Sequence, residues 1–274
     1  MLLIINADDF GLDEAINKGV VEAFKKGLCS STTLMTNTPG FQQACQLVHE
    51  NKLLKHVGVH LVLRDGYPLT EKIKYFPKFC NGEGQLCFSP KAMFVPLEVS
   101  EKKALAEEIR AQIRRCREYG IPLTHLDTHH HLHLIWEISS VLIPILKQED
   151  IPYLRIKENT NPDIPFRFKI YNHIFNYRLK IMGLARTKYY GSIAQFLALR
   201  EKLNSLDVIE SFSITVYPKI NAQQMLIDRI YDKEVDLETE VKQIDIYKDI
   251  ISYSGARFCY LVLMLWIYFE FCAL

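Results

Sequence analysis

The stretch LLIINADDFGLDEAINKGVVEAFKKG, residues 2–27, joins a short apolar run to a longer amphipathic one. Residues 2–6 form a compact apolar run, and residues 13–26 carry apolar side chains at intervals of three or four. The first pattern is typical of a buried strand, and the second of a helix with one apolar face. Asp13 is suited to cap this helix and Gly27 to end it. The stretch therefore predicts a β-strand followed at once by an α-helix.

This order of strand and helix recurs along the chain. Further strands are expected at residues 32–35, 56–63, 123–128, 153–157 and 209–216. Further helices are expected at residues 41–51, 100–119, 136–148, 194–203 and 237–252. Such alternation predicts an α/β fold with mainly parallel strands and outer helices, its sheet either open or closed into a barrel. Active groups in these folds lie beyond the carboxyl ends of the strands.

Length and composition fit one globular domain. A chain of 274 residues suits a single α/β barrel, and the domain is expected to cover residues 1–262. Apolar residues make up 49% of the chain and charged residues 24%, which excludes a disordered protein. The net charge is +1 with Lys and Arg spread along the chain, so no nucleic-acid partner is expected. The sequence leaves a homo-oligomer open.

The cysteines and the first residues indicate a reducing compartment. The seven cysteines are odd in number and form no CxxC pair, which argues against a zinc knuckle or a disulfide framework. The first residues lack the basic start and the small-residue cleavage site of a signal peptide. We therefore expect a cytoplasmic protein with free thiols.

Two segments depart from the regular pattern. Residues 64–96 are rich in glycine, proline and aromatic residues, and a connection of this length is expected to form a lid, a binding loop or a small excursion. Residues 263–274 are an atypical apolar tail that continues an apolar run beginning at Phe258. This run is at the lower length limit for a membrane-spanning helix. A last strand with an apolar tail is favoured over a membrane anchor, because no basic flank accompanies the run, and an altered terminus is the third interpretation.

Two adjacent carboxylates, Asp8 and Asp9, close the first strand. In an extended backbone they point to opposite faces, so they are expected to have different roles. Two anions packed at a strand end cost free energy unless a cation or hydrogen bonds offset it. The structural alternative is a turn in which one aspartate caps the next helix, although Asp13 is better placed for that cap.

Histidines gather after two later strands. His60 lies near the end of the expected strand 56–63, where a single histidine is most often structural. Residues 125–133, HLDTHHHLH, contain five of the nine histidines. If the backbone stays extended, alternate residues of this tract share one face: His125, Asp127, His129, His131 and His133.

These clusters together predict a metal site. Neutral imidazole binds divalent metals, and a nearby carboxylate can orient it. One aspartate and two histidines from three strand ends would leave open positions for water and substrate, as in catalytic metal sites. Water bound there becomes more acidic, and a neighbouring carboxylate can accept its proton. Asp8 is the candidate base if Asp9 is a ligand, and a solvated histidine-rich loop is the structural alternative.

Four blocks in this order resemble the YdjC-like carbohydrate deacetylases, a group that includes the chitooligosaccharide deacetylases. The blocks are NADDFG at 6–11, STTLMTN at 31–37, GVHLVL at 58–63 with a following G-x-P-L, and HLDTHHHLH at 125–133. The resemblance runs from residue 2 to about Lys157, and more weakly to about Leu261. Four blocks in order make it far more specific than any one of them.

The resemblance implies a distorted (β/α) barrel related to polysaccharide deacetylases. It also implies a divalent metal, usually assigned as magnesium with zinc as a chemical alternative, held by Asp9, His60 and His129. Asp8 matches the base of the family. Arg155 matches an arginine that holds substrate, and a surface ion pair is the other interpretation of this residue.

The chain departs from the family near its end. Where family members carry a His-Pro pair, this chain has Tyr217-Pro218, so a tyrosine replaces a candidate histidine proton donor. A tyrosine, with an ordinary pKa of about 10, is the weaker acid at neutral pH. Three further residues are expected behind the metal ligands or along the sugar site: Asp127, His131 and His125.

The sequence thus predicts a metal-dependent hydrolase that removes the acetyl group from an N-acetylated sugar such as a chitooligosaccharide. One alternative is a catalytically impaired homologue that binds sugar or metal. Another is a metal hydrolase acting on a different substrate class, such as phosphate esters. Membrane association through the tail 263–274, with a lipid-linked sugar as substrate, is the less favoured partner prediction.

Overall fold

The computed structural model describes residues 1–88, 95–157, 159–160, 164–203, 209–230, 233–244 and 250–253. The strand or anchor expected from Phe258, and the tail 263–274, lie outside these residues. Within the described part, no helix combines the length and the apolar character that crossing a membrane requires.

Seven parallel strands form the main sheet, in the order β5-β4-β3-β2-β1-β7-β6. They are β1 (Leu2–Phe10), β2 (Ser31–Leu34), β3 (Val57–Leu61), β4 (His125–Thr128), β5 (Tyr153–Leu154), β6 (Tyr189–Gly191) and β7 (Ser211–Val216). Strands β2, β3 and β4 are buried along their whole length. Burial on both faces is typical of a parallel sheet covered by helices.

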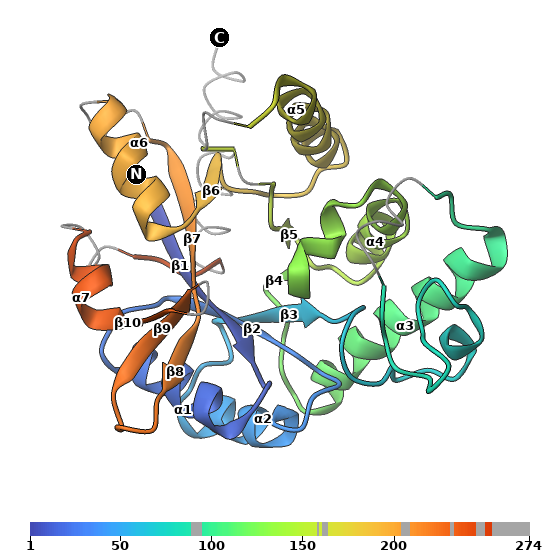
Figure 1. The fold of residues 1–274 in the computed structure, drawn as a ribbon, viewed down its shortest axis with the longest axis horizontal. Coiled ribbons are helices and arrows are strands. Elements are labelled where there is room, and N and C mark those ends of the chain that lie inside the picture. Colours follow the sequence, from blue (N-terminus) through green and yellow to red (C-terminus); the bar gives the residue numbers. More distant parts are fainter. Residues whose placement is uncertain are drawn as a thin grey trace, which may run out of the picture.

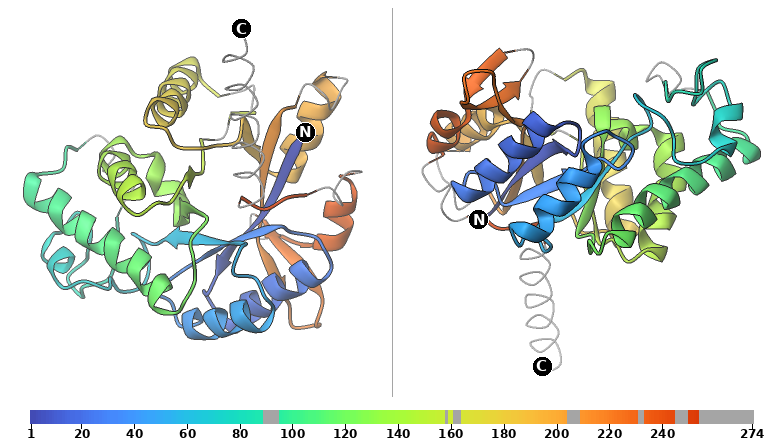
Figure 2. Two further views of the ribbon diagram at one scale, coloured as in Figure 1. Left: turned by 180° about the vertical axis from the view of Figure 1, so that it is seen from behind. Right: turned by 90° about the horizontal axis from the view of Figure 1, so that it is seen from below.

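Helices surround this sheet (Figure 1, Figure 2). They are α1 (Glu14–Lys25), α2 (Phe41–Glu50), α3 (Val99–Glu118), α4 (Trp136–Gln148), α5 (Phe166–Ile181), α6 (Ile193–Leu203) and α7 (Leu237–Lys242), with short 3-10 turns η1 (Lys72–Tyr75) and η3 (His129–Leu134). The first helix begins as predicted, because the Asp13 side chain accepts a hydrogen bond from the Ile16 backbone N–H at 2.8 Å. Helices α1 and α2 pack side by side at the bottom of Figure 1, and α3 packs on α4.

The main sheet curls until its two edges approach each other. Tyr153 of β5 forms an isolated parallel bridge to Ala185, which lies just ahead of β6 in the chain. The Ala185 backbone N–H also donates to the Pro152 carbonyl at 2.8 Å. The result is an incomplete barrel of parallel strands with helices outside, and the prediction of a distorted (β/α) barrel is confirmed.

Several elements differ from expectation. Helix α5 and strand β6 lie where no element is predicted, since α5 carries apolar residues on two opposite sides and so shows no single apolar face. The strand expected over 153–157 ends at Leu154, because β4 pairs with it only at His125 and Leu126. Of the helix expected over 237–252, the structure describes α7, and residues 245–249 lie outside its described part.

A second, antiparallel sheet in the order β10-β9-β8 was also not expected. Its strands are β8 (Pro218–Ile220), β9 (Leu226–Ile230) and β10 (Lys233–Asp236). Such short strands carry too few residues for an alternating pattern to stand out.

The segment expected to be a lid, a binding loop or an excursion is a folded excursion over residues 64–88. Phe79 and Phe88 are buried within it and stack with ring centroids 5.5 Å apart. Glu108 of α3 accepts hydrogen bonds from two backbone N–H groups of the excursion, at 3.0 and 2.9 Å. The segment is therefore held against the fold by buried aromatic residues that join the main core and by a buried carboxylate of α3.

The small sheet packs on α1 through a close backbone contact. Gly19 of α1 faces β8, and a Cβ at this position would lie 2.6 Å from the Cα of Lys219. A side chain fits there only if the β8 backbone moves, because protein interiors leave few voids. Gly19 thus sets the distance of the small sheet from α1, and with it the position of Arg229 in β9.

Gly19→Ala is expected to lower the free energy of unfolding, even though alanine is the better helix former by about 1 kcal/mol. Overpacking against Lys219 is expected to cost about 2 kcal/mol or more and to outweigh that gain. Chemical denaturation measures the difference. Gly82→Ala is the control, because a Cβ there meets nothing within 4 Å. A Gly19→Ala protein as stable as wild type would contradict the close packing of β8 on α1.

Candidate metal centre

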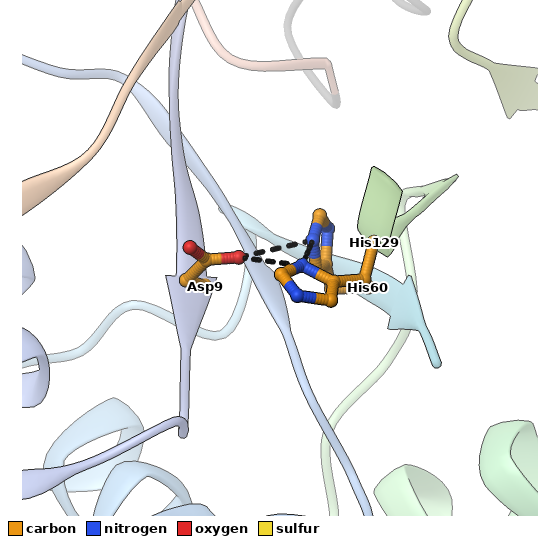
Figure 3. Close-up of side chains that lie close together, drawn as sticks. All are labelled: Asp9, His60 and His129. Atoms are coloured by element: carbon orange, nitrogen blue, oxygen red, sulfur yellow. Dashed lines mark hydrogen bonds and ion pairs between the residues drawn. The ribbon is translucent and has the colours of Figure 1, made fainter. Parts of the chain in front are cut away.

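Three strand ends bring one carboxylate and two imidazoles together (Figure 3). Asp9 lies near the end of β1, His60 in β3, and His129 directly after β4. Asp9 Oδ1 lies 3.2 Å from His60 Nε2 and 3.2 Å from His129 Nδ1. The two ring nitrogens are 3.4 Å apart. The three residues predicted as ligands therefore face one point at the carboxyl edge of the sheet.

Strand register and one unusual backbone angle explain this meeting. His60 pairs with Asp127 in the parallel register of β3 and β4, so the chain leaves β4 beside His60. Asp9 has a left-handed backbone with φ of 63°, which aspartate tolerates better than most residues. Its carboxylate points to the two histidines. Backbone held in this region costs free energy and is common at functional sites.

The donor set fits a divalent cation. Asp9 Oδ1 is buried with no hydrogen-bond partner among the residues that the structure describes. Leaving a buried carboxylate oxygen without a partner is costly, and a cation would remove that cost. The oxygen and the two ring nitrogens all lie within 4.8 Å of one another, close enough to share one ion. Two imidazoles and a carboxylate also leave open positions for water and substrate.

Asp127 orients His60 from behind. His60 Nδ1 lies 2.6 Å from Asp127 Oδ1 and 3.2 Å from Thr33 Oγ1. When Nδ1–H donates to the carboxylate, Nε2 presents its lone pair toward Asp9, as in the carboxylate–histidine pairs of metal sites. Asp127 is fully buried, which favours a place behind His60 over one along an open sugar site.

Charges within the cluster shift the pKa of both Asp9 and His60. Burial would raise the pKa of Asp9, but the adjacent rings of His129 and His60 hold it well below its usual range. Burial would lower the pKa of His60, but the charge and hydrogen bond of Asp127, with the adjacent carboxylate of Asp9, raise it to about 10. Because a histidine binds a metal only in its deprotonated form, cation binding at this centre is expected to release protons.

Asp8 has a different partner from its neighbour Asp9. Two nitrogens of Arg155 donate to its carboxylate, Nη1 to Oδ2 at 2.7 Å and Nη2 to Oδ1 at 2.6 Å. Arg155 Nη2 also contacts Asp127. Burial raises the pKa of Asp8, and the charge of Arg155 opposes that rise. Since only 1% of its side chain is exposed, Arg155 makes an interior ion pair and not one at the surface.

The histidine tract does not stay extended, and the expectation of five residues on one face is wrong. Strand β4 ends at Thr128, and His130 and His131 have left-handed backbones with φ of 57° and 55°. The chain turns back at His133, whose backbone N–H donates to Thr128 Oγ1 at 2.9 Å. Local side-chain to backbone bonding of this kind competes with extended structure.

His125 and His131 lie outside the three-residue cluster. His125 is buried, stacks on Tyr253 with ring centroids 3.9 Å apart, and lies 3.0 Å from Asn6 Oδ1. The ring of His131 lies beside Tyr190, with centroids 6.1 Å apart. Burial lowers the pKa of both histidines to about 3, so both are neutral at pH 7. Roles for His125 and His131 behind the ligands or along the sugar site stay predictions.

Sequence reasoning misses three residues that contact the centre. Thr33 Oγ1 donates to Asp127 Oδ2 at 3.2 Å, and Asn6 Nδ2 donates to Asp8 Oδ1 at 2.8 Å. Both residues lie in sequence blocks that carry the family resemblance, so they could have been predicted from the sequence as neighbours of the site. Arg229 of β9 gave no such signal, although its Nη2 lies 2.8 Å from Asp9 Oδ2.

Tyr217, the residue predicted to replace a family histidine, lies between β7 and β8. It is half-buried, and its backbone N–H donates to Asp228 Oδ1 at 2.7 Å. Burial and the charge of Asp8 raise the pKa of Tyr217 well above its usual value. The phenol is thus an even weaker acid than a tyrosine in water.

A second group of possible ligands lies at the surface. Asp65 Oδ2 is 3.0 Å from His130 Nε2 and 3.8 Å from His129 Nε2. The Asp65 side chain is 62% exposed, so water can satisfy it without a cation. The buried cluster around Asp9 is the stronger candidate for a metal.

Comparison with known protein families agrees with this geometry. A family model described as YdjC-like protein matches residues 2–236. The chain belongs to the YdjC-like family. The resemblance inferred from the four sequence blocks is confirmed.

Curated relatives of this YdjC-like chain include carbohydrate deacetylases. One from Clostridium beijerinckii is 40% identical over 161 residues. The match covers 57% of this chain and 61% of the Clostridium protein, which is less than two thirds of that protein's length. One from Vibrio parahaemolyticus is 29% identical over 255 residues, 93% of both chains. Among solved structures, an Enterococcus faecalis protein proposed to cleave cellobiose phosphate has a TM-score of 0.68 at 22% identity, covering 93% of this chain and 98% of that one. This structural likeness supports the fold.

His129→Ala is expected to weaken cation binding about tenfold or more, because it removes one of three ligands of the centre. His130→Ala is the matched control, since His130 contacts Asp65 outside the buried cluster. We expect its affinity to stay near that of wild type. Calorimetric titration with zinc measures both variants. If only His130→Ala lost zinc affinity, the cation would instead bind at the surface group of Asp65, His129 and His130.

Asp228 predicts a pH dependence of stability. Burial, with the charge of Glu240 nearby, raises its pKa to about 7. The folded protein then binds more protons than the unfolded chain between about pH 4 and pH 7, so stability is expected to fall as pH rises through that window. Asp228→Asn should match the wild-type melting temperature near pH 4 and exceed it at pH 8. Lower stability of the variant at pH 8 would contradict this assignment.

Proposed function

We propose that this protein is a metal-dependent hydrolase that removes the acetyl group from an N-acetylated sugar, with chitooligosaccharides as the substrate class. The observation that carries the proposal is the convergence of Asp9, His60 and His129, in which the buried Asp9 Oδ1 has no hydrogen-bond partner within the described part of the chain. Membership of the YdjC-like family supports it, because relatives in the comparison are named carbohydrate deacetylase.

In this proposal Asp9, His60 and His129 hold the cation, and Asp127 keeps His60 in the tautomer that binds it. When bound, the cation supplies a Lewis acid for the acetyl carbonyl and lowers the pKa of the attacking water. We propose magnesium as the metal. Zinc is the alternative, because imidazole is a good ligand for zinc.

Asp8 is the base in this proposal. One of its oxygens lies within 4.8 Å of a His60 nitrogen, so Asp8 borders the centre without belonging to the three-residue cluster. Burial raises its pKa and makes it a better proton acceptor at neutral pH. Arg155 binds both Asp8 oxygens and fixes the plane of the carboxylate. Because it is buried, Arg155 acts through Asp8 and not directly on the sugar.

The leaving amine needs a proton, and neither Tyr217 nor His131 is an efficient donor for it. Tyr217 occupies the position of the family's candidate donor, but its raised pKa makes it a poor acid. His131 is neutral at pH 7 because burial lowers its pKa to about 3. Once Asp8 has accepted the proton of water, it is itself an acid that can pass that proton to the amine.

Acetate release from N-acetylglucosamine oligomers tests the proposal. Wild type is expected to release acetate, to stop when a chelator removes the cation, and to recover with magnesium or zinc. Asp8→Asn is expected to lower kcat by about 10²–10⁴-fold with cation affinity retained, because Asp8 is a base and not a ligand. The melting temperature of the variant controls for the lost partner of Arg155. Acetate release that is indifferent to the chelator would refute the proposed mechanism.

A sugar-binding homologue with impaired catalysis is the second candidate, and Tyr217 favours it. Replacement of a histidine by a tyrosine with a raised pKa removes an efficient proton donor and leaves the cation ligands in place. This candidate predicts that the same oligomers bind in a calorimetric titration without any release of acetate. Release and binding measured on one preparation therefore separate the two functions.

A further inference from the structure

Helix α5 carries an apolar surface that the described part of the fold leaves uncovered. Five large side chains on it are between 45% and 76% exposed: Phe166, Ile170, Ile174, Tyr177 and Ile181. They recur every three or four residues, so at about 100° per residue they share an arc of about 80°, here named the apolar stripe. Single exposed apolar residues are ordinary, but an aligned row indicates an interaction site.

The stripe is not the side by which α5 packs on the fold. Phe175 and Leu179 lie on the opposite side of the helix and are fully buried. Arg178 donates to Ser139 Oγ at 2.9 Å and lies 4.3 Å from the ring centre of Trp136. Helix α5 lies at the margin of the molecule, at the top of Figure 1. Its stripe can therefore be changed without disturbing the side that holds α5 in place.

Basic residues border the stripe along both sides. By helical geometry Lys169, His173 and Lys180 lie on one side and Arg167 on the other. The helix contains no aspartate or glutamate. An apolar stripe between rows of lysine and arginine is the pattern of helices that lie in the plane of an anionic membrane surface.

A basic cleft lies beside the stripe. Its volume is about 690 Å³, and no acidic residue lines it in the described part of the chain. Five of its lining residues are lysine or arginine: Lys169, Lys180, Arg186, Lys188 and Lys202. Lys188 is paired with Glu210, which lies outside the lining, at 2.7 Å. The cleft thus places positive charge where lipid phosphates would lie if the stripe entered a membrane surface.

We propose that α5 docks the protein on an anionic phospholipid surface, with the apolar stripe among the acyl chains and the basic cleft against the headgroups. The proposal does not depend on the deacetylase activity. Charge argues against two other occupants. A second copy placed stripe to stripe would bring two sets of basic residues together. The apolar run 258–274 of the chain itself has a single acidic residue, Glu270, that could pair with the basic residues of α5.

Sedimentation of the full chain with vesicles tests the proposal. Binding is expected with vesicles of phosphatidylcholine mixed with phosphatidylglycerol, and not with phosphatidylcholine alone. It should weaken as ionic strength rises from about 0.1 M to about 1 M, because the Debye length shortens from about 10 Å to about 3 Å. A wild-type protein that ignores the anionic vesicles would overturn the proposal.

Variants separate the stripe from the rest of the surface. Ile170→Glu/Ile174→Glu is expected to lower vesicle binding about tenfold or more, because two apolar side chains can no longer enter the acyl chains. Lys180→Glu is expected to lower it about fivefold. Val99→Glu and Lys103→Glu on α3 are the matched controls, since both change exposed residues of the same kinds away from α5. We expect the controls to bind as wild type does.

Two further measurements complete the test. Acetate release from soluble oligomers should be equal in all α5 variants, because α5 contributes no residue to the metal centre. Vesicle binding by Ile170→Glu/Ile174→Glu at the wild-type level would overturn the proposal. If wild type binds no vesicles, two results for this variant would assign the stripe to another occupant and overturn the proposal. A changed oligomeric state would assign it to a second copy, and a lower melting temperature would assign it to residues 258–274.

Discussion

The ion pairs of the buried Arg155 guanidinium are the interactions on which the candidate metal centre depends. It binds Asp8 with two nitrogens and also contacts Asp127, and it joins the segment after β5 to β1 and β4. Together with Asp9, these carboxylates would otherwise repel one another in a region of low dielectric. Breaking one side of a buried ion pair costs about 3–5 kcal/mol, so this neutralisation holds the carboxyl edge of the sheet together.

The positions of the ligands follow from that neutralisation. With one oxygen near Arg155, Asp127 uses the other to hold His60 Nδ1, which turns Nε2 toward Asp9. The two carboxylates at the end of β1 therefore have separate partners, Asp8 on Arg155 and Asp9 on the histidines. Arg229 adds a second cation from the small sheet, whose position depends on the close contact of Gly19 with β8.

Sequence reasoning predicts the parts of this design that depend on local pattern. The alternation of strand and helix predicts the parallel sheet, and polar clusters after the strands predict where a site would form. It fails where local pattern and tertiary packing diverge. Helix α5 has an uncovered apolar stripe as well as a buried side, so no simple amphipathic pattern shows. The tract after β4 has histidines at alternate positions, but Thr128 bonds to His133 and turns the chain.

The sequence by itself determined the fold class, the family, and three side chains with the right chemistry to hold a cation. Each of those signals lies within a few consecutive residues, where spacing and residue type already limit the structure. Only the tertiary structure decided that Asp127 supports His60, that Arg155 is interior, and that Arg229 reaches Asp9. These contacts join residues between 67 and 220 positions apart, and such distances are fixed by strand register and packing, which no local pattern contains.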